Sequence, residues 1–299
     1  MADGGLVLRL PFRPPLDWDT MLGYFRLRAI PGVEAVAAGT YRRTVMVDGD
    51  PGVIEVSRGG DDHLLLRAHL PHREALIHVA QRVRRSFGLD TDLEKAGPVL
   101  GGDPAVGPLV AARPGLRVPG TWDAFETGVR AIVGQQVTVA GASTITGRLI
   151  QRHGLPVLGL APPELTHVFP AAATLAEADL DGVGLPGARI RAVRAFAEAV
   201  AGDRVRLDRS VGLDELVDSI TALPGLGPWT AHYIALRLGE PDALPASDLG
   251  LRRALANGSS PAVLPSADEL TLRAEAWRPW RALAAVHLWS SGLAATRLA

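Results

Sequence analysis

The sequence predicts an α+β fold, in which an antiparallel sheet with helices is followed by an all-α part that holds most of the chain. Strand-like runs separated by Gly/Asp turns lie within residues 1–96. Glycine and proline concentrate in residues 97–120, which indicates a linker. From residue 121 to 299 strand signals vanish, and alanine, leucine and arginine dominate at helical spacing.

The first domain, residues 1–96, is predicted to alternate strands with two helices. Asp17 is placed to cap the first helix, because an Asp side chain can accept a hydrogen bond from an amide of the first turn. Leu76, Val79, Ala80 and Val83 recur at helical spacing in the second helix. The expected strands are 6–10, 41–47, 53–57 and 63–70, and the expected helices are 18–29 and 72–87.

The second part, residues 121–299, is predicted to be a two-lobed helical core in which short Pro/Gly loops join the helices. A helical hairpin is expected within residues 213–237. The expected helices are 124–133, 137–153, 175–179, 189–201, 213–222, 230–237, 249–256, 267–277 and 282–290.

Composition excludes several classes of protein. The 299 residues include no cysteine, so disulfides, iron–sulfur clusters and thiolate zinc sites are excluded, and the 8 histidines lack metal-ligand spacing. No apolar run approaches the ~20 residues of a membrane span, and no basic segment followed by an apolar stretch opens the chain. We therefore expect a cytoplasmic protein with no membrane partner. The net charge of −1 argues against nucleic-acid binding over the whole surface, so any DNA contact must be local.

The most informative segment is Leu223-Pro224-Gly225-Leu226-Gly227-Pro228, between two predicted helices. Two glycines two residues apart permit a tight turn with positive φ. The turn opens into a helix N-terminus, whose free amides and dipole suit a phosphate. An ordinary turn between two helices is the alternative, since proline and glycine are common there.

The string LPGLGPWTA, with a helix on each side, resembles the helix–hairpin–helix superfamily of base-excision DNA glycosylases. The resemblance implies a helix–hairpin–helix glycosylase core. It also implies that no cofactor is required, although the hairpin carbonyls of Thr221, Leu223 and Leu226 can hold a structural monovalent cation. The hairpin residues expected to bind DNA are Gly225, Leu226, Gly227 and Thr230.

Asp248 is the candidate catalytic residue, because the string PASDLGLR resembles the catalytic segment of that superfamily. Cleavage of an N-glycosidic bond builds positive charge on the sugar, which an ionised carboxylate stabilises while it orients or activates water. From spacing alone, Asp248 could equally cap the following helix, and Asp242 competes for the role. The hairpin upstream favours Asp248.

Trp229 occupies the position at which bifunctional members of the superfamily place a lysine that forms a Schiff base with the sugar. The only lysine of the chain, Lys95, lies far away in sequence. We therefore expect a monofunctional enzyme in which water is the nucleophile and an abasic site is the product.

Aromatic residues indicate the base pocket, since a glycosylase flips its target base out of the stack and holds it against aromatic faces. Trp229 and Tyr233 share one helix face, and Trp289 lies near the C-terminus, whereas Trp277 and Trp280 are expected to be core residues. The wider match resembles the 3-methyladenine DNA glycosylase II family of alkylation repair. It is carried by the strings LDW, MLG, AARPGLR, DAFE, GVRAIVGQ, WRPWR and HLW.

This resemblance implies excision of alkylated purines, because cation–π attraction favours a methylated, positively charged base. It also places Gln136 where the family inserts a side chain into the gap left by the flipped base; a solvated loop glutamine is the alternative. The expected partner is double-stranded DNA with damaged bases, bound by a monomer. Two other functions stay open: a non-catalytic helix–hairpin–helix DNA-binding protein, and a glycosylase of the same fold for oxidised or mismatched bases.

Overall fold

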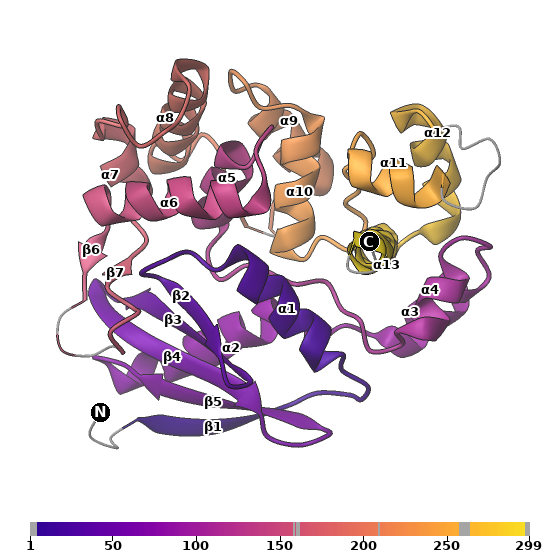
Figure 1. Cartoon of the computed structure of the whole chain (residues 1–299), viewed down its shortest axis with the longest axis horizontal. Coiled ribbons are helices and arrows are strands. Elements are labelled where there is room, and N and C mark those ends of the chain that lie inside the picture. The colour runs from indigo at the N-terminus through magenta and orange to yellow at the C-terminus, as the bar shows by residue number, and fades with distance from the viewer. Residues whose placement is uncertain (1–4, 158, 160–161, 209, 257–263, 297–299) are drawn as a thin grey trace.

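The structure is a computed structural model that describes residues 5–157, 159, 162–208, 210–256 and 264–296. A sheet domain built from the first part of the chain lies below a layer of helices (Figure 1). The expectation that the chain starts without an export signal rests partly on residues 1–4, which lie outside the described residues. None of the helices in the described ranges is long and apolar enough to cross a membrane.

The sheet has five strands in the order β1-β5-β4-β3-β2, and every neighbouring pair is antiparallel. Buried and part-exposed residues alternate along β5, so one face of the sheet packs on the core. The four-residue strand β2 was not predicted. The strands are β1 Leu6–Pro11, β2 Glu34–Ala37, β3 Thr40–Val47, β4 Asp50–Arg58 and β5 His63–His69.

Two helices complete this domain, α1 (Trp18–Arg28) and α2 (Leu76–Ser86), and α2 is preceded by a short 3-10 turn, η1 (Arg73–Ala75). The predicted cap of α1 is confirmed, because the Asp17 carboxylate accepts the Thr20 amide at 3.1 Å. One side of α1 packs on the sheet core through Trp18, Met21, Leu22 and Phe25.

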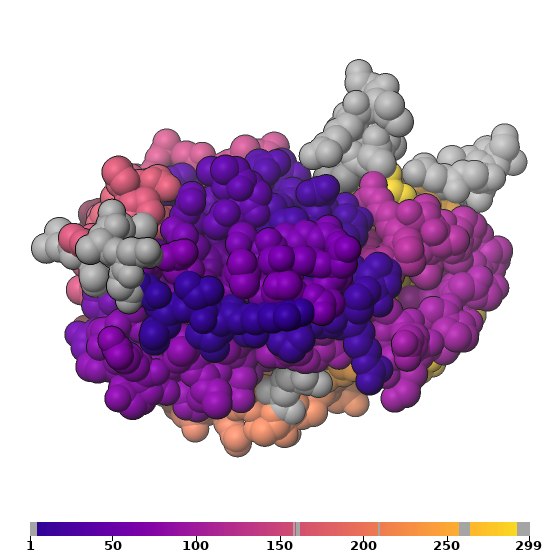
Figure 2. Space-filling view, turned by 90° about the horizontal axis from the view of Figure 1, so that it is seen from below, coloured from indigo at the N-terminus to yellow at the C-terminus, as the bar shows by residue number. Residues whose placement is uncertain are grey.

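Residues 97–120, the predicted linker, contain regular structure. Helices α3 (Leu93–Gly101) and α4 (Gly107–Ala112) occupy much of this range. They pack against the C-terminal lobe, where Trp277 Nε1 donates to Asp103 Oδ2 at 2.8 Å between the two helices. In Figure 2 this magenta pair lies at one end of the molecule, beside the indigo and purple sheet domain. Glycine and proline therefore mark turns here, and the surrounding packing stabilises the short helices.

The rest of the chain is helical, as predicted, apart from one short pairing of β6 (Leu155–Pro156) with β7 (His167–Val168). Its helices share one hydrophobic core, which includes Trp277 with none of its surface exposed, as expected of a core residue. The helices are α5 Ala124–Val133, α6 Val139–His153, α7 Ala172–Glu177, α8 Gly187–Ala201, α9 Leu213–Thr221, α10 Pro228–Leu238, α11 Leu249–Ala256, α12 Ala267–Arg273, the 3-10 turn η2 Ala274–Trp277 and α13 Arg281–Thr296.

Candidate active site

A cleft with a volume of about 760 Å³ runs between the sheet domain and the helical layer. Its lining comes from both parts of the fold and includes residues of α1, β2, β3, the segment before α5, α5, α6, α10 and the C-terminal lobe. Four of the sequence-predicted site residues line it, namely Trp229, Tyr233, Asp248 and Trp289. The fold therefore brings together side chains that are up to 60 positions apart in the sequence.

Asp248 precedes α11, and neutral donors hold its carboxylate. Trp229 Nε1 donates to Oδ2 at 2.9 Å, and Trp289 Nε1 donates to Oδ1 at 2.8 Å. The Leu251 amide also donates to Oδ1 at 2.9 Å, so the capping interaction and the indole contacts coexist. Within the described residues Asp248 forms no ion pair, and its negative charge stays available to a substrate in the cleft.

Gly250 makes this approach possible, a role that sequence reasoning missed. A Cβ built on Gly250 would lie 2.9 Å from Asp248 Oδ1 and 3.4 Å from the Trp289 ring. The first distance is too short unless the carboxylate moves, whereas the second is an ordinary van der Waals contact. The glycine in PASDLGLR therefore keeps space beside the carboxylate.

The three aromatic residues form one wall of the cleft. Trp229 and Tyr233 stack with ring centroids 5.3 Å apart and an angle of 9° between their planes, while Tyr233 meets Trp289 at 6.3 Å edge to face. A base sandwiched between two rings needs a separation of about 7 Å, twice an ordinary carbon contact. No base fits between Trp229 and Tyr233 in this arrangement, so the space between these two rings is excluded as the base pocket.

Asp242, the competing carboxylate, is tied to the C-terminal lobe. Arg281 Nε donates to its Oδ1 at 2.8 Å, and Arg278 Nη1 donates to its Oδ2. The residue does not belong to the cleft lining. Two arginines therefore neutralise Asp242, and the geometry favours Asp248 as the reactive carboxylate.

The hairpin between α9 and α10 has the expected backbone. Gly225 adopts φ +81°, a conformation that favours glycine, and Gly227 is the extended N-cap of α10. In the described part of the chain the amides of Gly225 and Gly227 meet no acceptor. Leu226 is buried, and its amide donates to the Leu223 carbonyl at 3.2 Å. The amides before this 11-residue helix are therefore unpaired, which an anion-binding turn requires.

Thr230 is buried, and its hydroxyl accepts a hydrogen bond from Gln135 Nε2 at 2.9 Å. Arg189 Nη1 donates to the Gln135 side-chain oxygen and, at 3.0 Å, to the Ile132 carbonyl. The Thr230 side chain thus positions the loop after α5 and does not face solvent. Sequence reasoning missed Gln135, because its partners lie 54 and 95 positions away.

Gln136 lies in that loop, is exposed, and has φ +63°. The residues around it, including Val137 and Val139, are also exposed, although valine is usually buried. Val137 and Val139 reach the edge of the cleft. The loop therefore presents a protruding, partly apolar surface next to the candidate active site.

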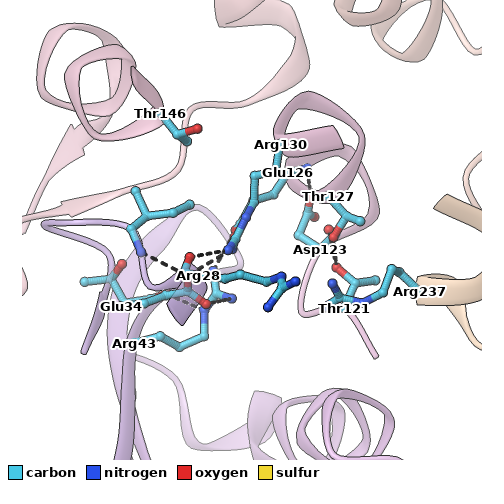
Figure 3. A network of polar contacts seen from close by, with 12 residues as sticks. Arg28, Glu34, Arg43, Thr121, Asp123, Glu126, Thr127, Arg130, Thr146 and Arg237 are labelled. Carbon is cyan, nitrogen blue, oxygen red and sulfur yellow. Dashed lines mark hydrogen bonds and ion pairs between the residues drawn. The ribbon is translucent and has the colours of Figure 1, made fainter. Parts of the chain in front are cut away.

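The deep end of the cleft holds a buried ionic cluster of Glu34, Arg43, Glu126 and Arg130 (Figure 3). Arg43 Nη2 donates to Glu126 at 2.7 Å, and Arg130 Nη1 donates to Glu34 at 2.9 Å and to Glu126 at 3.0 Å. Burial alone would raise the pKa of Glu34, but Arg130 and Arg43 lower it below its ordinary value. The cluster joins β2 and β3 to α5, and it fixes the two walls of the cleft to each other.

Most of the chain matches two known families of protein domains. Residues 129–280 match the family described as "HhH-GPD superfamily base excision DNA repair protein", and residues 7–123 match the "AlkA N-terminal domain". A solved structure titled "3-methyladenine dna-glycosylase from Archaeoglobus fulgidus" superposes with a TM-score of 0.83 at 21% identity, over 94% of this chain and 97% of that one. This likeness confirms the fold.

Two curated relatives are closer in sequence. "DNA-3-methyladenine glycosylase 2" of Escherichia coli (strain K12) is 35% identical over 94% of this chain and 95% of its own length. The "Probable bifunctional transcriptional activator/DNA repair enzyme AlkA" of Mycobacterium tuberculosis (strain ATCC 25618 / H37Rv) is 39% identical over 96% of this chain. The chain spans 57% of that longer relative. The chain therefore belongs to the HhH-GPD superfamily of base excision DNA repair proteins.

Proposed function

We propose that the protein is a DNA-3-methyladenine glycosylase, which hydrolytically removes alkylated purines from duplex DNA and leaves an abasic site. One observation carries the proposal: the Asp248 carboxylate has no cationic partner among the described residues, and two indole N–H groups hold it inside an aromatic cleft. The relative of Escherichia coli named above supports the same substrate class.

The carboxylate suits cleavage of an N-glycosidic bond. As the bond between C1′ and the base breaks, the base takes the bonding electrons and the sugar becomes cationic. Asp248 stabilises that charge and orients the water whose oxygen then bonds to C1′. Oδ1 already accepts from the Trp289 indole and the Leu251 amide, whereas Oδ2 accepts from Trp229 and keeps a second lone pair for the water.

A methylated purine fits this scheme because it carries positive charge and leaves as a neutral base. The aromatic wall attracts such a cation through its ring faces. The free face of the Tyr233–Trp229 stack and the edge of Trp289 are the surfaces on which we place the flipped base.

The described part of the cleft contains no lysine that could form a Schiff base with the sugar, as a lyase step requires. Trp229 occupies the position at which a Schiff-base lysine would stand, and its indole is committed to Asp248. Lys95 lies on α3, where its ammonium group pairs with Asp92 at 3.1 Å. These contacts support a monofunctional, hydrolytic enzyme.

We place duplex DNA across the hairpin and the loop after α5. The free amides of Gly225 and Gly227 would bind a phosphate, and Gln136 would enter the gap left by the flipped base. One copy of the chain supplies every element of this site, which supports a monomer as the active form.

A monovalent cation at the hairpin remains part of the proposal. Among the described residues, the carbonyls of Thr221 and Leu226 accept no hydrogen bond, and the Leu223 carbonyl accepts one from the Leu226 amide at 3.2 Å. Two free carbonyls and a third with a spare lone pair fit such an ion, which would add positive charge where the phosphate binds.

The decisive experiment measures release of free base from methylated duplex DNA by the wild type and by Asp248→Asn. We expect release of 3-methyladenine by the wild type and none above background by the variant. DNA binding without base release would favour the non-catalytic DNA-binding protein. A panel of duplexes with oxidised, mismatched and alkylated bases separates the other glycosylase class.

A further inference from the structure

Two arginines at the inner end of the aromatic wall have no carboxylate partner among the described residues. Arg28 comes from α1 and Arg237 from α10, and both are labelled in Figure 3. Arg237 donates from Nε to the Pro119 carbonyl at 2.6 Å and from Nη2 to the Gly120 carbonyl at 2.7 Å. Arg28 Nη1 is buried without a hydrogen-bond partner in the described part of the chain. Both side chains are only partly exposed, and a nearby negative charge stabilises a guanidinium group in such a position.

Two phenols face these guanidinium groups. Arg237 Nη1 donates to Tyr233 Oη at 3.1 Å and also to Tyr24 Oη, and the two phenolic oxygens are 3.3 Å apart. The ζ carbon of Arg28 lies 4.1 Å from the centre of the Tyr24 ring. Each phenolic oxygen thus already accepts a hydrogen bond from Arg237.

The number of phenolic protons that find an acceptor indicates whether one of the two tyrosines is ionised. If both phenols are neutral, one hydroxyl donates to the other, and the remaining phenolic proton has no acceptor among the described residues. If one phenol is ionised, Tyr24 donates to Tyr233 and no proton is left over. The phenolate also supplies the negative charge that Arg28 and Arg237 lack.

We propose that Tyr24 and Tyr233 are specificity-determining residues that together carry one phenolate charge, which lets the pocket accept a cationic purine despite the two arginines. The preference for cationic bases rests on the proposed function, whereas the phenolate itself does not. An ionised Tyr233 ring is also richer in electrons, so it attracts a stacked cation more strongly. The sheet domain contributes to base selection in this way, through Tyr24 on α1.

The surrounding charges agree with this assignment. Burial opposes ionisation of both phenols, but Arg237 and Arg28 lower the pKa of Tyr233 to about 7, while burial raises the pKa of Tyr24. Arg130 on α5 adds a further nearby cation, whose own charge is compensated by Glu34 and Glu126. Asp248 lines the same cleft, with both oxygens held by indoles.

Titration of the folded protein tests the phenolate directly, because the chain has only 3 tyrosines. Phenolate absorbance in the near ultraviolet should show one group ionising near pH 7, about three units below an ordinary tyrosine. Tyr233→Phe should abolish this transition, and Tyr24→Phe and Arg28→Gln should move it upward. Tyr41→Phe is the matched control and should leave it in place, since burial and Glu34 raise the pKa of Tyr41 well above its ordinary value. A folded wild type with no such ionisation below about pH 9 would overturn the proposal.

Base release tests the consequence for specificity. Single-turnover release of cationic 7-methylguanine and neutral hypoxanthine is compared at about pH 8, where Tyr233 is ionised. Tyr24→Phe should lower the ratio of the 7-methylguanine rate to the hypoxanthine rate about tenfold, one pKa unit of lost charge stabilisation. An unchanged ratio would contradict the role in specificity. A wild type that releases neither base would instead contradict the proposed function, and the titration would still decide the phenolate.

Discussion

The carboxylates at the two ends of the cleft have different hydrogen-bond and ion-pair partners. At the deep end, Glu34 and Glu126 are each bound by Arg43 and Arg130, so two negative charges meet two positive ones. At the aromatic end, the donors to Asp248 within the described part of the chain are all neutral. A carboxylate whose charge is compensated holds the structure together, whereas one whose charge is merely oriented can act on a substrate.

The largest predicted effect comes from removing the charge of Asp248, the carboxylate at the aromatic end. Asp248→Asn removes the charge and keeps the size, so base release from methylated DNA should fall about a thousandfold or more. The measurement is single-turnover release of methylated base, with binding to abasic duplex DNA as the test that the variant still folds. The matched control is Asp242→Asn, whose carboxylate is bound by arginines outside the cleft. Equal losses of rate in the two variants would contradict the distinction.

The same kind of substitution at the deep end of the cleft should affect stability instead of catalysis. Glu126→Gln leaves Arg43 and Arg130 short of one negative charge, so the free energy of unfolding should fall by about 3 kcal/mol. Chemical denaturation measures that loss. Base release by the folded fraction should stay within severalfold of the wild type, because the cluster touches no reacting group. If Glu126→Gln had normal stability and a thousandfold slower reaction, the deep end would be catalytic and not structural.

A smaller effect sharpens the role of the neutral donors. Trp289→Phe keeps an aromatic ring but removes the N–H that reaches Asp248 Oδ1 at 2.8 Å. With one indole left, we expect base release to slow about tenfold, the cost of one hydrogen bond to a charged group. Trp280→Phe is a suitable control, because that indole only packs on the core. No difference between the two variants would mean that orientation of the carboxylate does not limit the reaction.

Local patterns predicted most of the elements and the residues that the fold brings together at the aromatic end of the cleft. The hairpin, Asp248 and its two tryptophans could be assigned because their motifs are contiguous. The Tyr24–Tyr233 contact could not, because it joins residues 209 positions apart that carry no motif. Strand β2 was missed because four residues including two alanines have little strand signal, and pairing with β3 creates the strand. Helices α3 and α4 were missed because their stability comes from packing against the C-terminal lobe.

The smallest predicted effect concerns Gln136, the residue with positive φ in the loop after α5. Gln136→Gly removes a strain of about 1 kcal/mol but increases the freedom of the unfolded chain by a similar amount. The free energy of unfolding should therefore change by less than about 1 kcal/mol. Base release should nevertheless slow severalfold, because glycine has no side chain to fill the gap in the duplex. Gln136→Leu, which restores bulk without an amide, should recover most of the rate. Failure of leucine to do so, with glycine still slow, would assign the effect to hydrogen bonding by the amide and not to the space that the side chain fills.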